Sequence, residues 1–325
     1  MKYLEVLERE NGYVAKLEEM EDPRPGAGEL LLRVAASGVN RADLSQIAGV
    51  YPPPPGESEI LGLEAAGTIE NTGEKACALL AGGGHAQLVA VPEGQLFPAP
   101  RGMTLVSGAA IPEVFVTAFV NLVVEAALRE GETLLVHAGA SGVGLTAIQV
   151  GRFLGARVAA TTRTASKVPA LVQAGAELAI DSSRDSFGET IEQRWGKDAV
   201  SIVLDPVGAE TLAKDLQVLA TGGRIVFLAT LSGALAQLDI RMLMAKRARV
   251  IGSMLRARPR SEKAALIARF RREILPGFDD GRLRVVVDSI YPPEKAAEAF
   301  ASMRANRNVG KIVIDWSGSA DRVSG

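Results

Sequence analysis

The chain has 325 residues, with 36 lysines and arginines against 38 aspartates and glutamates, and a formal net charge of −2 at pH 7. Hydrophobic residues make up 47% of it and charged residues 23%, which is typical of a globular protein with a sizeable core. The slight negative charge disfavours a surface that binds nucleic acid, so no nucleic-acid partner is expected. The length favours about two domains.

Cysteine content and apolar runs indicate where such a chain works. Cys77 is the only cysteine, which excludes an intramolecular disulfide and is typical of a reducing compartment. The first residues carry charges and lack the apolar core of a signal peptide. No uninterrupted apolar run approaches the roughly 18 residues of a membrane span. We therefore expect a cytoplasmic protein with no membrane partner.

The first third of the chain is strand-like and divided by glycine and proline. Apolar and polar residues alternate over residues 29–37, and residues 64–70 and 86–91 look similar, which predicts half-buried strands. Turn-rich segments around residues 51–56 and 82–84 separate them.

From about residue 111 the pattern changes to strands that alternate with helices. Strands are predicted at residues 133–137, 157–161, 178–180, 200–204, 223–229 and 249–254, with helical stretches between most of them. Six strands with crossover helices predict a doubly wound parallel sheet, and hence the α/β class.

The C-terminal part returns to the character of the first third. After Pro259 the sequence predicts an amphipathic helix over residues 262–274, a strand over 284–290, a helix over 293–303 and a strand over 311–315. We therefore predict one split domain of residues 1–118 and 260–325, with a nucleotide-binding domain of residues 119–259 inserted into it.

A glycine-rich turn follows the first strand of the alternating region and opens a helix. Gly142, Gly144 and Ala147 fit G-x-G-x-x-G/A, the phosphate-binding fingerprint of dinucleotide folds. Small residues let the backbone approach a pyrophosphate, and free N–H groups at a helix N-terminus attract its negative charge. The strand–turn–helix context favours a cofactor site over a glycine turn without a ligand.

The next predicted strand indicates which cofactor binds. NAD enzymes place Asp or Glu about 20 residues past the first glycine, where it binds the ribose 2′-hydroxyl. Thr162 and Arg163 stand there instead, followed by Lys167. Hydroxyls and cations suit a 2′-phosphate and hence NADPH, although both cations could be ordinary solvated charges. Asp181 would weaken this prediction if its carboxylate faced the phosphate.

Several motifs, in a shared order over nearly the whole chain, resemble the zinc-free quinone oxidoreductase family of the medium-chain dehydrogenase/reductase superfamily. They are G-V-N-R-A-D at residues 38–43, L-G-L-E-A-A-G at 61–67, A-A-I-P at 109–112, H-A-G-A-S-G-V-G at 137–144 and G-K-I-V at 310–313. Y-P-P-P-P-G at 51–56 and L-R-A-R at 255–258 are most similar to the p53-inducible quinone oxidoreductase branch. The resemblance implies a GroES-like, mostly β catalytic domain, an inserted Rossmann domain that binds NADPH, and usually a homodimer.

Metal binding divides this superfamily. Zinc alcohol dehydrogenases need cysteine and histidine ligands for a tetrahedral site. Asn40 and Leu63 stand where those enzymes place a cysteine and a histidine, and the whole chain has one cysteine and two histidines. We therefore expect no metal, with His85 a loop residue and His137 structural.

Without a metal, the protein must position the nicotinamide against an electron-poor acceptor. Hydride transfer to a quinone or conjugated carbonyl develops negative charge on an oxygen, which hydrogen-bond donors stabilise. By resemblance, Asn40 and Tyr51 are the candidate catalytic donors, although Asn40 could be only a helix cap and Tyr51 only a packing aromatic. The candidate cofactor-binding residues, from the fingerprint and from the resemblance, are Thr117, Gly139, Ser141, Gly142, Val143, Gly144, Thr162, Arg163, Lys167, Ala229, Leu231 and Leu255.

The leading functional interpretation is an NADPH-dependent quinone oxidoreductase with a small-molecule quinone or enone substrate. An enoyl reductase acting on an α,β-unsaturated ketone or thioester is the nearest alternative, in which Arg256, Arg258 and Arg260 could bind a carrier phosphate. A non-catalytic NADPH-binding sensor is an alternative from another class. The apolar predicted strand at residues 249–254 could lie at a sheet edge and pair across a two-fold axis, so a homodimer is expected.

Overall fold

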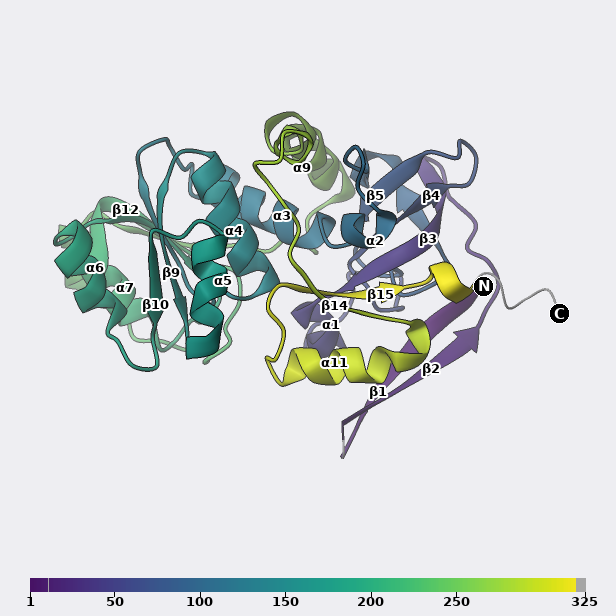
Figure 1. The fold of residues 1–325 in the computed structure, drawn as a ribbon, viewed down its shortest axis with the longest axis horizontal. Coiled ribbons are helices and arrows are strands. Elements are labelled where there is room, and N and C mark those ends of the chain that lie inside the picture. The colour runs from purple at the N-terminus through teal and green to yellow at the C-terminus, as the bar shows by residue number, and fades with distance from the viewer. Residues whose placement is uncertain (11, 320–325) are drawn as a thin grey trace. The chain divides into compact units, whose positions relative to one another are not determined.

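The computed structural model describes residues 1–10 and 12–319, which belong to two compact units (Figure 1). One unit comprises Met1–Val116 and Leu255–Gly325, and the other comprises Thr117–Met254. Each unit has its own main sheet and its own core.

Six parallel strands form the sheet of the Thr117–Met254 unit, in the order β10-β9-β8-β11-β12-β13. Parallel pairing brings the carboxyl ends of all six strands to one edge. The chain runs outward from β8 in both directions, and such a reversal point is where open α/β sheets bind their ligands. The strands are β8 (Thr133–Val136), β9 (Arg157–Thr162), β10 (Leu178–Asp181), β11 (Val200–Asp205), β12 (Leu219–Phe227) and β13 (Arg249–Gly252).

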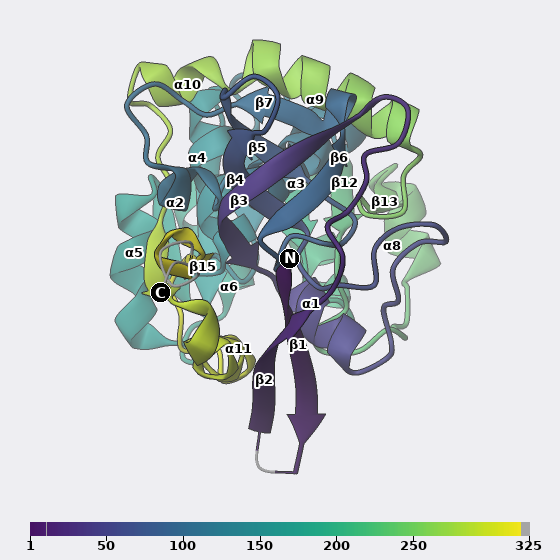
Figure 2. The same ribbon diagram turned by 90° about the vertical axis from the view of Figure 1, so that its right-hand side faces the viewer.

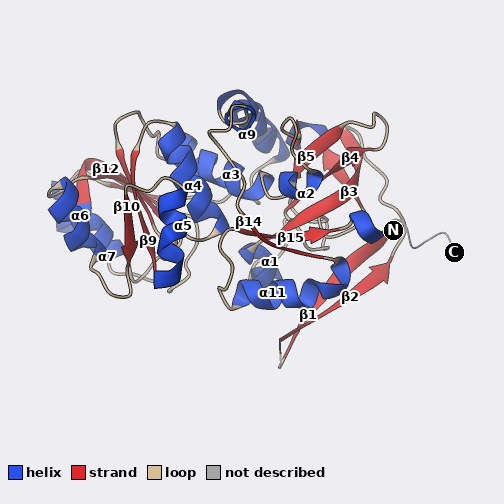
Figure 3. Ribbon diagram, viewed as in Figure 1, coloured by secondary structure: helices blue, strands red, loops and turns tan. Residues whose placement is uncertain are grey.

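Helices cover both faces of this sheet (Figures 1 and 3). α4 (Gly142–Phe153) and α5 (Val168–Gln173) lie on one face, and α6 (Phe187–Trp195) and α7 (Leu212–Val218) lie on the other. The π-helical segment η2 (Val120–Glu125) precedes β8, and α8 (Ile240–Ala245) precedes the edge strand β13. Leu135, Val203 and Ile225 are fully buried at the centre, because a sheet covered on both faces needs apolar residues on both. The predicted doubly wound parallel sheet is confirmed.

A mostly antiparallel sheet of seven strands forms the other unit, along the path β14-β15-β3-β4-β5-β7 with β6 paired to β3. β15 lies antiparallel to β3, with Ile312 opposite Val39, so the C-terminal segment completes the sheet of the first third. The strands are β3 (Glu29–Val39), β4 (Glu64–Ile69), β5 (Lys75–Leu79), β6 (Leu88–Pro92), β7 (Leu96–Pro98), β14 (Val287–Tyr291) and β15 (Lys311–Asp315).

A hairpin of β1 (Lys2–Arg9) and β2 (Gly12–Glu19), which was not predicted from the sequence, packs against α11 (Ala296–Arg304), and Figure 2 shows its two strands side by side. Phe300 on α11 lies 6.1 Å from the ring of Tyr13. α9 (Arg260–Glu273) packs on the sheet through Phe270, whose ring lies 5.3 Å from that of Phe97. The remaining helical segments of this unit are α1 (Arg41–Ile47), α2 (Leu105–Gly108), α10 (Pro276–Asp279) and the short turns η1 (Glu93–Gln95), η4 (Pro293–Lys295) and η5 (Ser317–Ser319). α3 (Pro112–Phe119) begins in this unit, and its last three residues belong to the other.

Some predicted bounds shift in the structure. The strand predicted at residues 223–229 is β12, which starts earlier and ends at Phe227, so Ala229 lies in the loop that follows. The two glycines of β12 hid its first half, since glycine weakens a strand pattern. The helix predicted at 293–303 begins as the 3₁₀ turn η4, because prolines occupy its start.

Among the residues that the structure describes, one segment is long and apolar enough to cross a membrane. It is Leu105–Glu125, 21 residues with a mean hydropathy of 1.7, and 78% of its most apolar window is buried inside the protein. A core helix of a globular protein passes the same test, and the burial of the segment favours that interpretation. The sequence did not predict this segment as a candidate membrane span, because Pro112, Glu113 and Asn121 interrupt its apolar run.

Candidate functional site

The turn between β8 and α4 has the geometry of a phosphate-binding turn. Ser141 caps α4, and its hydroxyl oxygen accepts the backbone N–H of Gly144 at 3.0 Å. A side chain at Gly144 would lie 2.4 Å from the carbonyl oxygen of Ala138, so the turn can close this tightly only around glycine. Gly139 donates its N–H to the carbonyl oxygen of Thr161 at 2.7 Å, which ties the turn to β9. The first-turn N–H groups of Gly142 and Val143 have no acceptor within a helix and suit an anion.

The residues predicted to select the cofactor follow β9, the neighbour of β8 in the sheet. Thr162 is buried at the end of β9, and its hydroxyl accepts the N–H of Thr164 at 3.4 Å. Arg163 is exposed in the next position, and Lys167 is half-buried in the turn η3 (Ala165–Lys167). The structure therefore brings both cations to the sheet edge that carries the glycine turn.

Asp181, which counted against NADPH, is tied to its own loop. One of its oxygens accepts the N–H of Ser183 at 3.1 Å and the Ser183 hydroxyl at 2.7 Å, and the other lies 3.7 Å from Arg184. These hydrogen bonds, chiefly from the Ser183 side chain, hold the pKa of Asp181 below its usual value. The carboxylate stays charged, but Arg184 offsets part of that charge locally.

His137 stands directly before the glycine turn and is almost completely buried. Its Nδ1 lies 2.9 Å from the Thr161 hydroxyl, and its Nε2 lies 2.8 Å from a carboxylate oxygen of Asp215. Burial alone would lower the pKa of His137, but the charge and hydrogen bond of Asp215 outweigh burial and raise it. Burial in turn raises the pKa of Asp215 to about 6. No sequence signal identifies this partner, which lies 78 positions along the chain.

The other predicted cofactor contacts are dispersed. Thr117 is buried, and its carbonyl oxygen accepts the side-chain N–H of Asn121 at 2.7 Å. Ala229 and Leu231 lie in the loop after β12, where Leu231 is 50% exposed and donates its N–H to the carbonyl oxygen of Pro206 at 3.1 Å. Leu255 is buried and begins the second segment of the other unit. Their contact with a nucleotide stays a prediction.

Asn40, the first candidate donor, lies in a buried polar network of its own unit. Its side-chain N–H groups donate to Glu64 at 2.9 Å and to the carbonyl oxygen of Gly38 at 3.1 Å. Lys311 donates to the Asn40 amide oxygen at 2.6 Å and lies 2.5 Å from the same Glu64 oxygen. The backbone N–H of Asn40 donates to Asp43 at 2.7 Å at the start of α1. Both amide hydrogens are thus occupied, which makes Asn40 the weaker of the two candidate donors.

Glu64 also contacts α3, which carries Glu113, a titratable residue that was not predicted from the sequence to belong to a site. Its second oxygen accepts the backbone N–H of Glu113 at 2.8 Å. A side chain at Gly38 would lie 2.2 Å from Glu64, so glycine there makes room for the carboxylate. Burial, then the negative charge of Glu64, raises the pKa of Glu113 to about 8. Glu113 is therefore mostly a neutral acid at pH 7. The sequence alone, in which Glu113 is a single glutamate among apolar residues, does not predict this protonation state.

Tyr51, the second candidate donor, is half-buried in the proline-rich turn after α1. The guanidinium of Arg256 lies 5.2 Å from its ring centre, and Arg256 donates to the Tyr51 carbonyl oxygen at 3.1 Å. Burial, then the charge of Glu113, raises the pKa of Tyr51. The phenol therefore stays protonated at neutral pH and can donate a hydrogen bond.

The three arginines considered for a carrier phosphate are engaged within the protein. Arg258 pairs with Glu262 at 2.6 Å, and Arg260 pairs with Glu29 at 2.6 Å and with Glu57 at 3.1 Å. Arg256 is only 5% exposed. This arrangement does not present a cationic surface to a phosphate.

The donor set does not fit a zinc site. Within residues 1–10 and 12–319, no three His, Cys, Asp or Glu side chains converge as a metal site requires. Burial raises the pKa of the Cys77 thiol, so the thiolate that zinc needs is disfavoured. His85 is fully buried, with its Nδ1 2.8 Å from the Ser37 hydroxyl and its Nε2 3.6 Å from Asp43. Leu63 is buried and offers no ligand atom.

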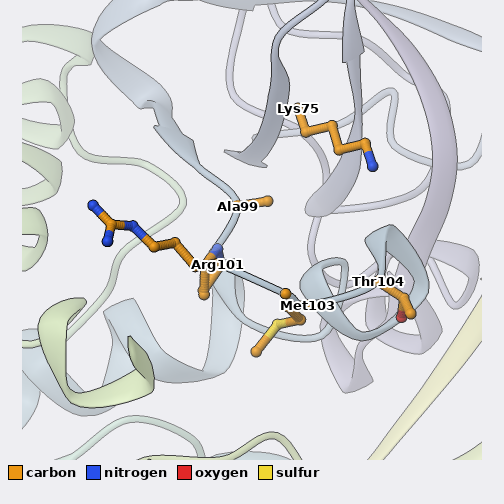
Figure 4. A pocket seen from close by; sticks show the side chains of 7 residues that line it. Lys75, Ala99, Arg101, Met103 and Thr104 are labelled. Atoms are coloured by element: carbon orange, nitrogen blue, oxygen red, sulfur yellow. The ribbon is translucent and has the colours of Figure 1, made fainter. Parts of the chain in front are cut away.

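A shallow hollow of about 460 Å³ lies beside the loop that follows β7 in the antiparallel unit (Figure 4). In Figure 4 the charged ends of Lys75 and Arg101 point away from each other, so they do not form a joint anion site. None of the residues that line the hollow is a predicted site residue. The lining residues are Lys75, Ala99, Pro100, Arg101, Gly102, Met103 and Thr104.

Known proteins share both units. The family described as the alcohol dehydrogenase GroES-like domain matches residues 26–82, and the family described as zinc-binding dehydrogenase matches residues 142–272. The solved quinone oxidoreductase from Thermus thermophilus, whose complex with NADPH is also known, is 32% identical, with a TM-score of 0.81 over 97% of this chain and 100% of that chain. The chain belongs to the medium-chain dehydrogenase/reductase superfamily. Its relatives include the quinone oxidoreductase of Homo sapiens, 28% identical over 97% of each chain. The solved CurK enoyl reductase is also similar, with 25% identity and a TM-score of 0.83 over 97% of this chain and 98% of that chain.

These similarities confirm the predicted fold class, a GroES-like β domain with a parallel-sheet Rossmann domain. They also make the chain an oxidoreductase of a superfamily that binds nicotinamide cofactors and acts on small molecules.

Proposed function

We propose that this chain is an NADPH-dependent quinone oxidoreductase that works without zinc. The observation that carries the proposal is the β8–α4 turn, closed around Gly144, with two cations and no carboxylate in the segment directly after β9. The pyrophosphate of the cofactor would lie against the first-turn N–H groups of α4. Arg163 and Lys167 would bind the 2′-phosphate, since charge-assisted hydrogen bonds to phosphate are strong. The complex of the Thermus thermophilus enzyme with NADPH supports this choice.

The acceptor side rests on Tyr51. When bound, NADPH supplies a hydride to the acceptor, and the acceptor oxygen gains negative charge that a positioned donor stabilises. The neutral phenol of Tyr51 is the donor, with Asn40, Glu64 and Lys311 forming the buried network of the same unit. One hydride and one proton convert the quinone to a hydroquinone and leave NADP⁺. The proton comes from solvent or from a protonated side chain.

An enoyl reductase is the second candidate, favoured by the similarity to CurK enoyl reductase. It would use the same hydride chemistry on a conjugated carbonyl. The ion pairs of Arg258 and Arg260 weigh against a thioester on a phosphate-bearing carrier, and so favour a small free enone within this class.

Assays with alternative acceptors separate the candidates. Oxidation of NADPH is followed with 1,4-benzoquinone, 9,10-phenanthrenequinone, crotonyl-CoA and a simple enone. Turnover with the quinones and not with crotonyl-CoA supports the proposal. Turnover with the enone or crotonyl-CoA alone establishes the enoyl reductase. NADPH binding without turnover of any acceptor supports the non-catalytic sensor.

We also propose a homodimer formed through β13. This strand is the edge of the parallel sheet, and its free edge can pair with a second copy across a two-fold axis. Exposed apolar side chains in the segment of residues 235–254, which includes β13, support an interface: Leu235 at 93%, Ile240 at 64%, Met244 at 71%, Val250 at 41% and Met254 at 54% exposed. We also propose a cytoplasmic location, which a single, buried cysteine without a disulfide supports.

A further inference from the structure

Arg256 is a buried cation that donates its hydrogen bonds to neutral acceptors within the described part of the chain. Its guanidinium donates to the carbonyl oxygen of Ala81 at 2.8 Å, to that of Tyr51 at 3.1 Å and to the side-chain oxygen of Gln46 at 2.6 Å. Arg258 and Arg260, a few positions further on, pair with carboxylates instead. Burying a charge without an ion-pair partner is costly, so such a residue needs a structural or chemical reason.

The acceptors of Arg256 lie on three separate segments. Gln46 is in the last turn of α1, Tyr51 is in the proline-rich turn that follows, and Ala81 lies beyond the end of β5. The planar guanidinium also lies 5.2 Å from the centre of the Tyr51 ring, in the range of a cation–π contact. One side chain thus holds both the backbone and the ring of Tyr51 relative to α1 and the sheet.

The charges around the phenol act in opposite directions. The pKa of Tyr51 is raised by burial and by the nearby Glu113, whereas Arg256 lowers it. Burial lowers the pKa of Arg256 itself, but an arginine remains charged at any physiological pH. Arg256 therefore opposes the effect of burial and of Glu113 on the Tyr51 hydroxyl.

We propose that Arg256 is a positioning residue for Tyr51, fixing the ring so that its hydroxyl donates to the acceptor oxygen during reduction. This inference rests on the proposed function, because it assigns Arg256 to the Tyr51 step of that reaction. It differs from the carrier-phosphate role that the sequence left open for the same arginine. The geometry gives Arg256 an internal partner, not a substrate phosphate.

The kinetic test compares Tyr51→Phe, Arg256→Met, Arg256→Lys and the double variant Tyr51→Phe with Arg256→Met. Loss of the Tyr51 donor should lower kcat with a quinone by about 100-fold, the scale of one positioned hydrogen-bond donor to a developing oxyanion. Arg256→Met should lower kcat by at least about tenfold and Arg256→Lys by less, because lysine keeps the charge but not the planar fork. The double variant should be no slower than Tyr51→Phe alone, since residues that act through one group are not additive. NADPH affinity should not change.

Arg304→Met is the matched control. Arg304 also lies over a tyrosine ring, 5.6 Å from the centre of Tyr13, and pairs with Glu8. It should lose the same type of contact with no change in kcat. Additive losses in the Tyr51–Arg256 double variant, or full kcat in Arg256→Met, would overturn the proposal.

A second measurement does not depend on turnover. The tyrosinate absorbance of the wild type, minus that of Tyr51→Phe, gives the titration of Tyr51. Because Arg256 lowers the pKa of Tyr51, Arg256→Met should move this titration to higher pH, and Arg304→Met should leave it in place. An unshifted titration contradicts the positioning of Tyr51 by Arg256. Absence of any quinone turnover by the wild type, with the shift present, instead refutes the proposed function alone.

Discussion

At the scale of single residues, the proposed preference for NADPH over NADH rests on the position directly after β9. Arg163 is exposed there, next to the buried Thr162, where enzymes specific for NAD carry a carboxylate. Because the Arg163 side chain is already in solvent, it can move toward a phosphate without a change in core packing. A substitution of Arg163 should therefore change cofactor selectivity without lowering the stability of the fold.

We expect Arg163→Asp to lower the affinity for NADPH by at least about tenfold, since a charge-assisted hydrogen bond contributes about 1.5–3 kcal/mol and a repulsion replaces it. The affinity for NADH should stay the same or rise, because the new carboxylate can accept the ribose 2′-hydroxyl. Fluorescence titration with both nucleotides measures the two constants. Arg194→Asp, an exposed change on α6, is the control. An equal loss for both nucleotides would show that Arg163 does not read the 2′-phosphate.

The His137–Asp215 pair should make the stability of the fold depend on pH. The pKa of His137 is raised above its usual 6.5 by Asp215, so the stability from this pair is present at low pH and lost as pH rises through the raised value. The raised pKa of Asp215, about 6, acts in the same direction between its usual value and pH 6. His137→Gln should lower the free energy of unfolding by roughly 1.5–3 kcal/mol at pH 6 and by less at pH 9. Urea unfolding at both pH values measures the difference, and an equal loss at both would contradict a charged His137.

At the scale of elements, the Asn40–Glu64–Lys311 network joins β3, β4, β15 and the start of α1. Lys311 and Glu64 are both almost fully buried, and their charged atoms are in direct contact. Removing one member of a buried ion pair leaves the other uncompensated, which is far more damaging than the pair is stabilising. β15 is thus attached to β3 and β4 by the buried Lys311–Glu64 ion pair as well as by its backbone hydrogen bonds to β3.

Lys311→Met should lower the free energy of unfolding by about 3–5 kcal/mol, because Glu64 is left as an unpaired buried carboxylate. Adding Glu64→Gln should restore part of that loss. Lys295→Met, an exposed lysine before α11, should change stability by less than about 0.5 kcal/mol. Chemical denaturation checks all four proteins, and a Lys311→Met protein as stable as the wild type would contradict the network.

The elements also show what the sequence can and cannot predict. The β8–α4 turn was predictable because Gly142, Gly144 and Ala147 follow one another at fixed spacing in a local strand–turn–helix pattern. The β1–β2 hairpin was not predicted, since its strands are half-exposed and their charges blur the alternation. The pairs His137–Asp215 and Tyr51–Arg256 lie 78 and 205 positions apart, and no local pattern encodes such contacts. The fold and the glycine turn between β8 and α4 were therefore open to prediction, whereas these long-range polar pairs were not.

At the scale of the whole molecule, the proposed dimer rests on the free edge of β13. Val250→Glu places a charge on this edge, 41% exposed in the single chain, and should reduce a dimer to monomers. Val172→Glu, on α5 and 57% exposed, is the control and should leave the mass unchanged. Light scattering at micromolar concentration gives the masses. A monomeric wild type would end the dimer proposal, and a dimeric Val250→Glu would place the interface elsewhere.

The most direct test of the proposed oxidoreductase is a titration of the purified protein with NADPH and with NADH, followed by addition of 1,4-benzoquinone while the absorbance of the reduced nicotinamide is recorded. We predict that NADPH binds at least about tenfold more tightly than NADH, a difference of about 1.4 kcal/mol, and is oxidised only when the quinone is present. Failure to bind either nucleotide would contradict the assignment of the β8–α4 turn, and with it the central claim.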